Sequence, residues 1–162
     1  MRRTRSILLA ALLVTAAPSA ALADGTLFLG ANTTPSSRAT RGFAVGIGFL
    51  VFGFEFEYSN TSDDLESVAP GLKTFMGNVL LQTPFEIMGF QPYFTTGVGG
   101  YRESLEDIGH QETNLATNVG GGAKIGLIGP VRLRLDYRLF RLSGGALNTP
   151  AHRIYAGLNL KF

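Results

Sequence analysis

Residues 131–142 read VRLRLDYRLFRL. Apolar side chains at positions 131, 133, 135, 137 and 139 alternate with charged side chains at 132, 134, 136 and 138. Successive side chains of a strand point to opposite faces, so the alternation predicts a β-strand with one apolar and one charged face. A helix would scatter the arginines around its circumference and leave no apolar stripe. The pattern does not say which of the two faces is buried.

The same alternation recurs along the chain and predicts eight strands. Four longer polar loops (33–41, 61–72, 102–113 and 143–151) alternate with three short turns (50–53, 84–89 and 127–130). An up-and-down meander with one smooth end and one loop-rich end is typical of a transmembrane barrel. We therefore predict an all-β fold, an eight-stranded antiparallel up-and-down transmembrane β-barrel, with strands at 25–32, 43–49, 54–60, 73–83, 91–101, 115–125, 131–142 and 152–162.

The first 23 residues have the organisation of a cleaved signal peptide. Three arginines precede an apolar run over 7–17, and Ala21-Leu22-Ala23 supplies a small-x-small cleavage site. The apolar run is too short for a spanning helix, which needs about 20 residues. We expect a signal peptide at 1–23 and one barrel domain at 24–162. The mature chain then has 14 − 3 = 11 basic and 12 acidic residues, which gives no indication of nucleic-acid binding.

The chain contains no cysteine and only 16% charged residues. The absence of cysteine excludes a disulfide framework, a thiolate metal site, a cysteine nucleophile and a lipoprotein attachment point. The low charge content is unusual for a water-exposed surface, because typical globular domains carry about 25% charged residues.

The charged strand faces are expected to line the barrel interior. A soluble barrel that binds an apolar ligand would place its apolar faces inside, but its outer surface would carry more Lys and Glu. An arginine at the bilayer midplane would cost about 2–4 kcal/mol, and paired charges in a narrow lumen avoid this penalty. We predict a structural charge network in the lumen that consists of Glu55, Glu57, Lys124, Arg132, Arg134, Asp136, Arg138, Arg153 and Lys161.

Aromatic residues gather towards the ends of the predicted strands. This distribution is typical of the interfacial girdles of membrane barrels. Arg141 interrupts an apolar face near a strand end, where its side chain can reach lipid headgroup phosphates. The aromatic residues concerned are Phe43, Phe49, Phe54, Tyr58, Phe85, Phe90, Tyr137 and Phe162.

The strand count, the leader ending in ALA and the final segment IYAGLNLKF resemble the small eight-stranded outer-membrane barrels of Gram-negative bacteria, of the outer membrane protein A and X type. The resemblance covers residues 24–162 and implies a location in the cell outer membrane. It also implies that the barrel-assembly machinery recognises the C-terminal strand. The residues that match this assembly signal are Ile154, Leu158, Leu160 and Phe162.

The sequence contains few residues that suggest chemistry. His110 and His152 lack the spacing of an outer-membrane lipid deacylase, whose histidine and serine stand one residue apart on one face. Acidic residues in 61–72 and 102–113 lack the spacing of a calcium-binding loop. The glycines of 97–101 and 118–124 precede no helix and so do not form a phosphate-binding loop. We therefore expect no catalytic residues, no cofactor and no metal.

These observations predict a monomeric, non-enzymatic outer-membrane barrel whose role is structural or carried by its external loops. Expected partners are outer-membrane lipid, lipopolysaccharide and, during insertion, the barrel-assembly machinery. The loop partner is not predicted. The alternatives are a secreted soluble barrel that binds an apolar ligand, an outer-membrane lipid-modifying enzyme and a narrow pore.

Overall fold

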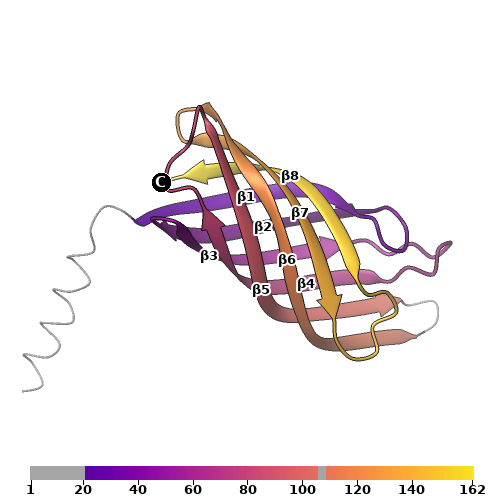
Figure 1. Ribbon diagram of the computed structural model, residues 1–162. Helices are drawn as coiled ribbons and strands as arrows, with labels where there is room; N and C mark the ends of the chain where they lie inside the picture. The colour runs from indigo at the N-terminus through magenta and orange to yellow at the C-terminus, as the bar shows by residue number, and fades with distance from the viewer. Residues whose placement is uncertain (1–20, 106–108) are drawn as a thin grey trace, which may run out of the picture.

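The computed structural model describes residues 21–105 and 109–162, which form eight antiparallel strands (Figure 1). Within these ranges, no helix is long and apolar enough to cross a membrane. The strands are β1 (Ala21–Asn32), β2 (Arg38–Phe49), β3 (Phe52–Thr61), β4 (Gly71–Gln82), β5 (Phe90–Leu105), β6 (His110–Ile128), β7 (Val131–Leu142) and β8 (Ala151–Lys161).

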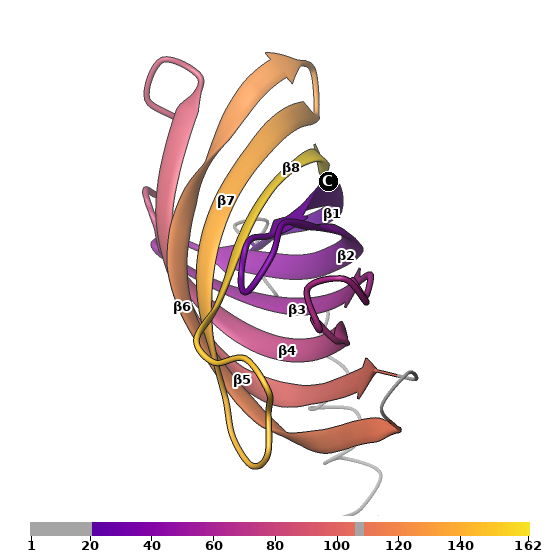
Figure 2. The same cartoon turned by 90° about the vertical axis from the view of Figure 1, so that its right-hand side faces the viewer.

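Each strand pairs with the next one along the chain, and β8 returns to pair with β1, so the sheet closes into a barrel. The curvature of the sheet is visible in Figure 2. Closure satisfies the backbone hydrogen bonds of every strand without an open edge, as a membrane-spanning sheet requires. The predicted eight-stranded up-and-down barrel is confirmed.

Short turns and longer loops occupy opposite ends of the barrel. The turn end holds the β2–β3, β4–β5 and β6–β7 connections together with the C-terminus (Figure 1). Gly129 has a φ of 54° in the two-residue turn between β6 and β7, a conformation that glycine adopts without a steric penalty. The loop end holds the connections 33–37, 62–70 and 143–150.

The predicted third loop, 102–113, is largely wrong. Ladder pairs continue from Arg102 opposite Thr113 to Leu105 opposite His110, so β5 and β6 are longer than expected. Beyond the apolar band, both faces of a hairpin can be polar, and a polar composition therefore does not end a strand there. His110, which was placed in the loop, begins β6.

The N-terminal part of β1 overlaps the predicted signal peptide. Ala21 to Ala23 pair with Phe49 to Ile47 of β2, while residues 1–20 lie outside the described ranges. Cleavage after Ala23 stays a prediction. If it occurs, the ladder between β1 and β2 begins at Asp24 opposite Gly46.

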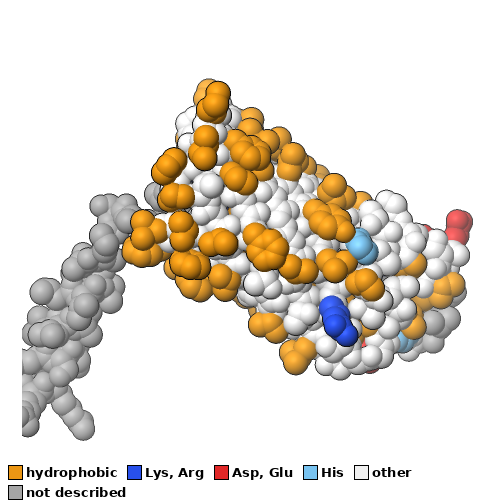
Figure 3. All heavy atoms as spheres, viewed as in Figure 1, with side chains coloured by type: hydrophobic (Ala, Val, Ile, Leu, Met, Phe, Trp, Pro, Cys, Tyr) orange, Lys and Arg blue, Asp and Glu red, His pale blue; other side chains and the backbone are white. Residues whose placement is uncertain are grey.

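The outer wall of the barrel is apolar. Leu27 and Leu29 of β1 are each 71% exposed, and Leu135 and Tyr137 of β7 are about half exposed. Hydrophobic side chains are spread along the wall seen in Figure 3, whereas the lysine, arginine and histidine side chains on this face occur only towards the loop end. A surface of this kind suits hydrocarbon rather than water.

Candidate functional site

The charged face of β7 points into the barrel. Arg134 and Arg138 are fully buried, and Arg132 and Asp136 are 4% and 3% exposed. The apolar residues between them lie on the outer wall, so the strict alternation of residues 131–139 separates the two environments. Residues 131–139 thus have hydrophobic side chains on the outer wall and guanidinium groups in the lumen.

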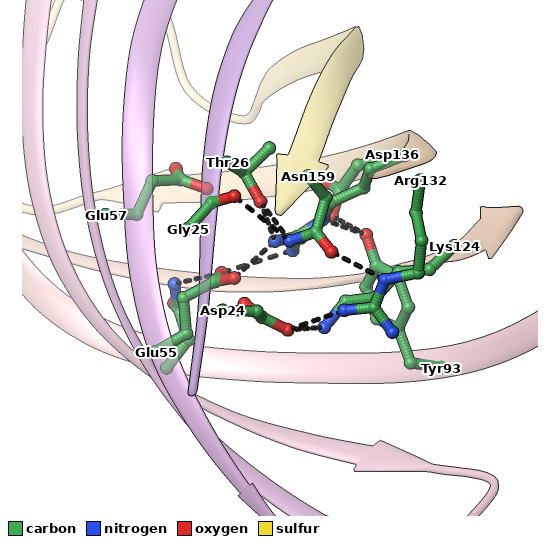
Figure 4. A network of polar contacts seen from close by, with 12 residues as sticks. Asp24, Gly25, Thr26, Glu55, Glu57, Tyr93, Lys124, Arg132, Asp136 and Asn159 are labelled. Carbon is green, nitrogen blue, oxygen red and sulfur yellow. Dashed lines mark hydrogen bonds and ion pairs between the residues drawn. The ribbon is translucent and has the colours of Figure 1, made fainter. Parts of the chain in front are cut away.

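Two carboxylates hold the two central arginines. Arg134 forms a two-pronged ion pair with Glu55, and its Nη2 lies 3.2 Å from Asp136 Oδ2. Arg138 lies 2.9 Å from both Glu55 and Asp136. The Tyr93 hydroxyl donates to Asp136 and accepts from Arg134 Nε at 2.7 Å. Each buried charge therefore has opposite charges and hydrogen bonds close by, as burial demands (Figure 4).

Glu57 connects this centre to β8. Its carboxylate pairs with Arg153 and lies 3.0 Å from Arg138 Nη1. Arg138 and Arg153 are direct cross-strand neighbours, an arrangement that is repulsive unless an anion lies between the two cations. Arg153 also donates to the Ser59 hydroxyl at 2.6 Å. Glu57 thus neutralises a pair of arginines that the strand register forces together.

A second group of charges fills the turn end of the lumen. Lys124 pairs with Asp24, and Arg132 Nη2 lies 3.1 Å from the same carboxylate. Arg132 also lies 3.4 Å from Glu86 and donates to Asn159 at 2.7 Å. Lys161 lies 4.0 Å from Glu86 and is 37% exposed at the rim. The structure thus brings together eight of the nine predicted network residues as buried groups and leaves Lys161 at the edge.

The structure adds Asp24, Glu86 and Tyr93 to the predicted charge network. Asp24 directly follows the expected cleavage site and lies one position before the predicted first strand, although it continues the inward series of Thr26 and Phe28. Glu86 comes from a turn, where alternation gives no signal. Tyr93 fits because Gly122 lies opposite it; a Cβ on Gly122 would lie 2.6 Å from the Tyr93 hydroxyl.

The loop half of the lumen contains an apolar plug, which lies among buried polar side chains such as Arg38. Met76 is fully buried, and Phe140 is 1% exposed at a position where it packs under the Arg153 guanidinium, 4.5 Å from its ring centre. Ala146, from the last loop, packs against the plug and thereby covers it. The apolar plug consists of Leu72, Met76, Tyr101, Ala116, Phe140, Leu142 and Ala151.

Little free space remains between the lumen side chains. A cavity beside Asp24 and Lys124 measures about 10 Å³, and one at the turn end beside Glu86 measures about 50 Å³. The first has room for about one water molecule. The lumen therefore resembles a packed protein core rather than a channel.

The two histidines lie apart. His110 Nε2 is 3.3 Å from Glu103, and His152 Nδ1 is 2.6 Å from the Tyr137 hydroxyl. Within residues 21–105 and 109–162, neither imidazole hydrogen-bonds a serine or threonine hydroxyl, and no three metal-ligating side chains converge. These contacts can orient the rings but do not assemble a nucleophile with a base.

The predicted assembly signal lies on the outer face of β8. Ile154, Leu158 and Leu160 are each about half exposed, and Phe162 is 72% exposed. The Phe162 backbone N–H donates to the Ala23 carbonyl at 2.9 Å, so the last residue lies against β1. Recognition of these residues by an assembly machinery stays a prediction.

No family model matches the sequence, and no curated protein matches it. Solved structures do. The N-terminal β-barrel domain of Pseudomonas aeruginosa OprF aligns with a TM-score of 0.65 at 14% identity, over 87% of this chain and 97% of that chain.

Two further barrels align over similar lengths. Neisserial surface protein A has a TM-score of 0.62 at 16% identity, over 88% of this chain and 96% of its own. Ail, the attachment invasion locus protein of Yersinia pestis, has a TM-score of 0.54 at 13% identity, over 88% and 99%. The chain has the fold of the small eight-stranded outer-membrane β-barrels.

Proposed function

We propose that this protein is a monomeric, non-enzymatic outer-membrane barrel that anchors its loops at one membrane surface. The observation that carries the proposal is the filled lumen, which holds an ion-pair network in its turn half and an apolar plug among buried polar side chains in its loop half. A barrel packed in this way is suited to hold its loops rigidly and has no open path for a solute.

The loop end is built as a connected surface. The Ser36 hydroxyl donates to Asp64 at 2.8 Å and so links the first loop to the second. Leu147 N donates to the buried Glu103 at 2.9 Å, which holds the last loop against β5. Leu65 and Val68, at the tip of the second loop, are more than half exposed. We propose this loop surface as the part that contacts external partners.

Cysteine labelling tests the membrane topology directly, because the native chain contains no cysteine. Ser67→Cys in the second loop should react with a membrane-impermeant maleimide on intact cells. Met88→Cys, in the β4–β5 turn, should react only after permeabilisation. Both positions are exposed, so a difference in labelling reports the side of the membrane. Equal labelling of both on intact cells, or recovery of the protein in the soluble fraction, would refute the proposal.

Planar-bilayer recording distinguishes a barrel with a filled lumen from a pore. The filled lumen predicts no sustained single-channel current from the folded protein. A steady current that disappears on heat denaturation would show that the lumen conducts, and the pore alternative would replace this proposal.

A lipid-modifying enzyme is tested by substituting both histidines. If the protein is non-enzymatic, the His110→Gln and His152→Gln variants and the native protein should give the same pattern of lipid A species by mass spectrometry. A lipid species that appears only with the native protein would overturn the non-enzymatic assignment.

A further inference from the structure

In the described strands, the outer wall carries basic side chains but no carboxylate. In the described strands, every aspartate and glutamate side chain lies on the inward face of the alternation, from Asp24 to Asp136. The outward series instead carries one basic residue on each of β2, β4, β5, β7 and β8. We call these residues the basic belt: Arg41, Lys73, Arg102, Arg141 and His152.

The basic belt lies towards the loop end of the wall. Counted from the turn end of the barrel, four outward positions on β4, Leu81 to Phe75, come before Lys73. On β2, four outward positions, Phe49 to Phe43, come before Arg41. Eight residues of a strand tilted by about 40° rise roughly 20 Å across the membrane, which is close to the height of the apolar band. The belt cations therefore reach the level of the lipid headgroups on the loop side.

Lys73 and Arg102 form a pair of like charges in the basic belt. The two residues are direct cross-strand partners on β4 and β5, and both side chains are exposed. Like charges placed opposite each other are destabilising. Inside the lumen the equivalent pair, Arg138 and Arg153, has Glu57 between its guanidinium groups. Among residues 21–105 and 109–162, no carboxylate forms an ion pair with Lys73 or Arg102, so an external anion would complete this pair.

A groove in the outer wall begins beside the belt. It measures about 810 Å³, and its polar lining residues are Arg41, Tyr58 and Asn60. The remainder of the lining is apolar and includes Leu29 and Leu158, on either side of the small Ala156. Asn60 stands in the register between Arg41 and Lys73, so the groove leads directly to the cation pair.

We propose that the basic belt binds the phosphates of a lipid in the loop-side leaflet, with an acyl chain of that lipid in the groove. The proposal rests on the proposed outer-membrane location. The ligand class is a phosphorylated glycolipid or phospholipid with a net negative headgroup, because the belt supplies positive charge and most of the groove lining is apolar. Arg41, Lys73 and Arg102 form the centre of the site, since they follow one line of paired residues across β2 to β5.

Native mass spectrometry of the folded, detergent-purified protein tests the proposal with a bis-phosphorylated lipid A as the probe. The native protein should bind it, and the Arg41→Gln/Lys73→Gln/Arg102→Gln variant should bind roughly 100-fold more weakly, at about fivefold for each cation near a charged headgroup. The charge-preserving Arg41→Lys/Lys73→Arg/Arg102→Lys variant should bind like the native protein. Lys161→Gln, at the opposite end of the barrel, should also leave binding unchanged.

Two further arms identify the source of the phosphate. The same glycolipid without its phosphates should bind as weakly to the native protein as lipid A binds to the Gln variant. Inorganic phosphate should not displace lipid A, because it lacks the acyl chain that occupies the groove. Equal binding of lipid A to the native and Gln variants, equal binding of the phosphate-free lipid, or displacement by inorganic phosphate would each overturn the proposal.

The outcome is separable from the test of the proposed function. Each variant is first checked for a heat-modifiable gel shift and for insertion into phosphatidylcholine vesicles, which contain no net negative lipid. A protein that inserts but does not distinguish the phosphorylated probe contradicts the basic belt alone. A native protein that stays soluble without detergent contradicts the membrane location itself.

Discussion

The two halves of the lumen are filled by different kinds of side chain. In the turn half, most of the side chains around Arg134 carry charge or form hydrogen bonds. In the loop half, Met76 and Phe140 belong to the apolar plug, which lies among buried polar side chains. Arg153 lies at the boundary, with Glu57 on one side of its guanidinium and the Phe140 ring on the other.

The two halves should differ in how well they tolerate substitution of a lumen side chain. A buried ion pair stabilises little by itself, but the loss of one partner leaves an uncompensated charge in a dry site. An apolar side chain that is shortened loses only its own contacts and leaves a cavity. The polar half should therefore be the more fragile of the two, although the two halves are equally well buried.

The largest effect is expected in the polar half. Arg134→Met removes one of the two arginine partners of Glu55 and of Asp136, and it should lower the free energy of unfolding by about 3–5 kcal/mol. Urea unfolding in lipid vesicles, followed by the heat-modifiable gel shift, measures the change. An exposed control, Arg141→Met, should change the value by less than about 0.5 kcal/mol in phosphatidylcholine vesicles, which contain no net negative lipid. Similar losses for the two variants would show that the buried pairing is not needed.

A smaller loss is expected in the apolar plug. Met76→Ala removes a fully buried side chain and should cost about 2–4 kcal/mol in the same unfolding measurement. Met76→Leu conserves the volume and should cost less than about 1.5 kcal/mol. If Met76→Ala is more damaging than Arg134→Met, the expected ranking of the two halves is reversed.

Loss of the hydrogen bond that holds the last loop over the apolar plug should affect only the residues nearby. Glu103→Ala removes the acceptor of the Leu147 N–H, and amide hydrogen exchange at Leu147 should become roughly 10- to 150-fold faster, because a hydrogen bond to a carboxylate contributes about 1.5–3 kcal/mol. Exchange in the middle of β7 should stay unchanged and serves as the internal control. A uniform acceleration across the barrel would mean that the contact supports the whole fold rather than the loop.

The smallest effect concerns the link between the first two loops. The hydrogen bonds from Ser36 and then Ser67 hold the pKa of Asp64 below its ordinary value of 3.8. The folded-state pKa is therefore the lower one, and the stabilising contribution is present above pH 3.8 and is lost as the pH falls through the folded pKa. Ser36→Ala should raise the pKa of Asp64 towards 3.8 in an NMR titration, whereas Ser62→Ala, which does not contact Asp64, should not. An unchanged pKa in Ser36→Ala would show that the loops are not linked through this bond.

The sequence predicted the fold and the polar half of the lumen better than the apolar half. Strict alternation, as in residues 131–139, occurs where one face meets lipid and the other meets charges. It weakens in KTFMGNVLLQT (73–83), because Met76 faces the plug while Phe75 faces the lipid side, and both faces are apolar. Periodicity carries no information there about which face is inside. Phe75, Val79 and Leu81 lie on the outer face.

Other features depend on the three-dimensional register rather than on any local pattern. The pairing of Lys73 with Arg102 and of Arg138 with Arg153 follows from strand alignment, which the sequence does not specify residue by residue. The same holds for Glu86, which enters the lumen from a turn. The length of the β5–β6 hairpin was underestimated because its outer part, beyond the apolar band, has the composition of a loop.

The buried arginines also constrain the order of events in biogenesis. Arg132, Arg134, Arg138 and Arg153 come from the two strands synthesised last, whereas Asp24, Glu55 and Glu57 come from the first and third. A flat, half-formed sheet in the bilayer would show these guanidinium groups to hydrocarbon, at about 2–4 kcal/mol each near the midplane. Barrel closure and membrane insertion must therefore proceed together. Neither step can be completed before the last strand, β8, is present.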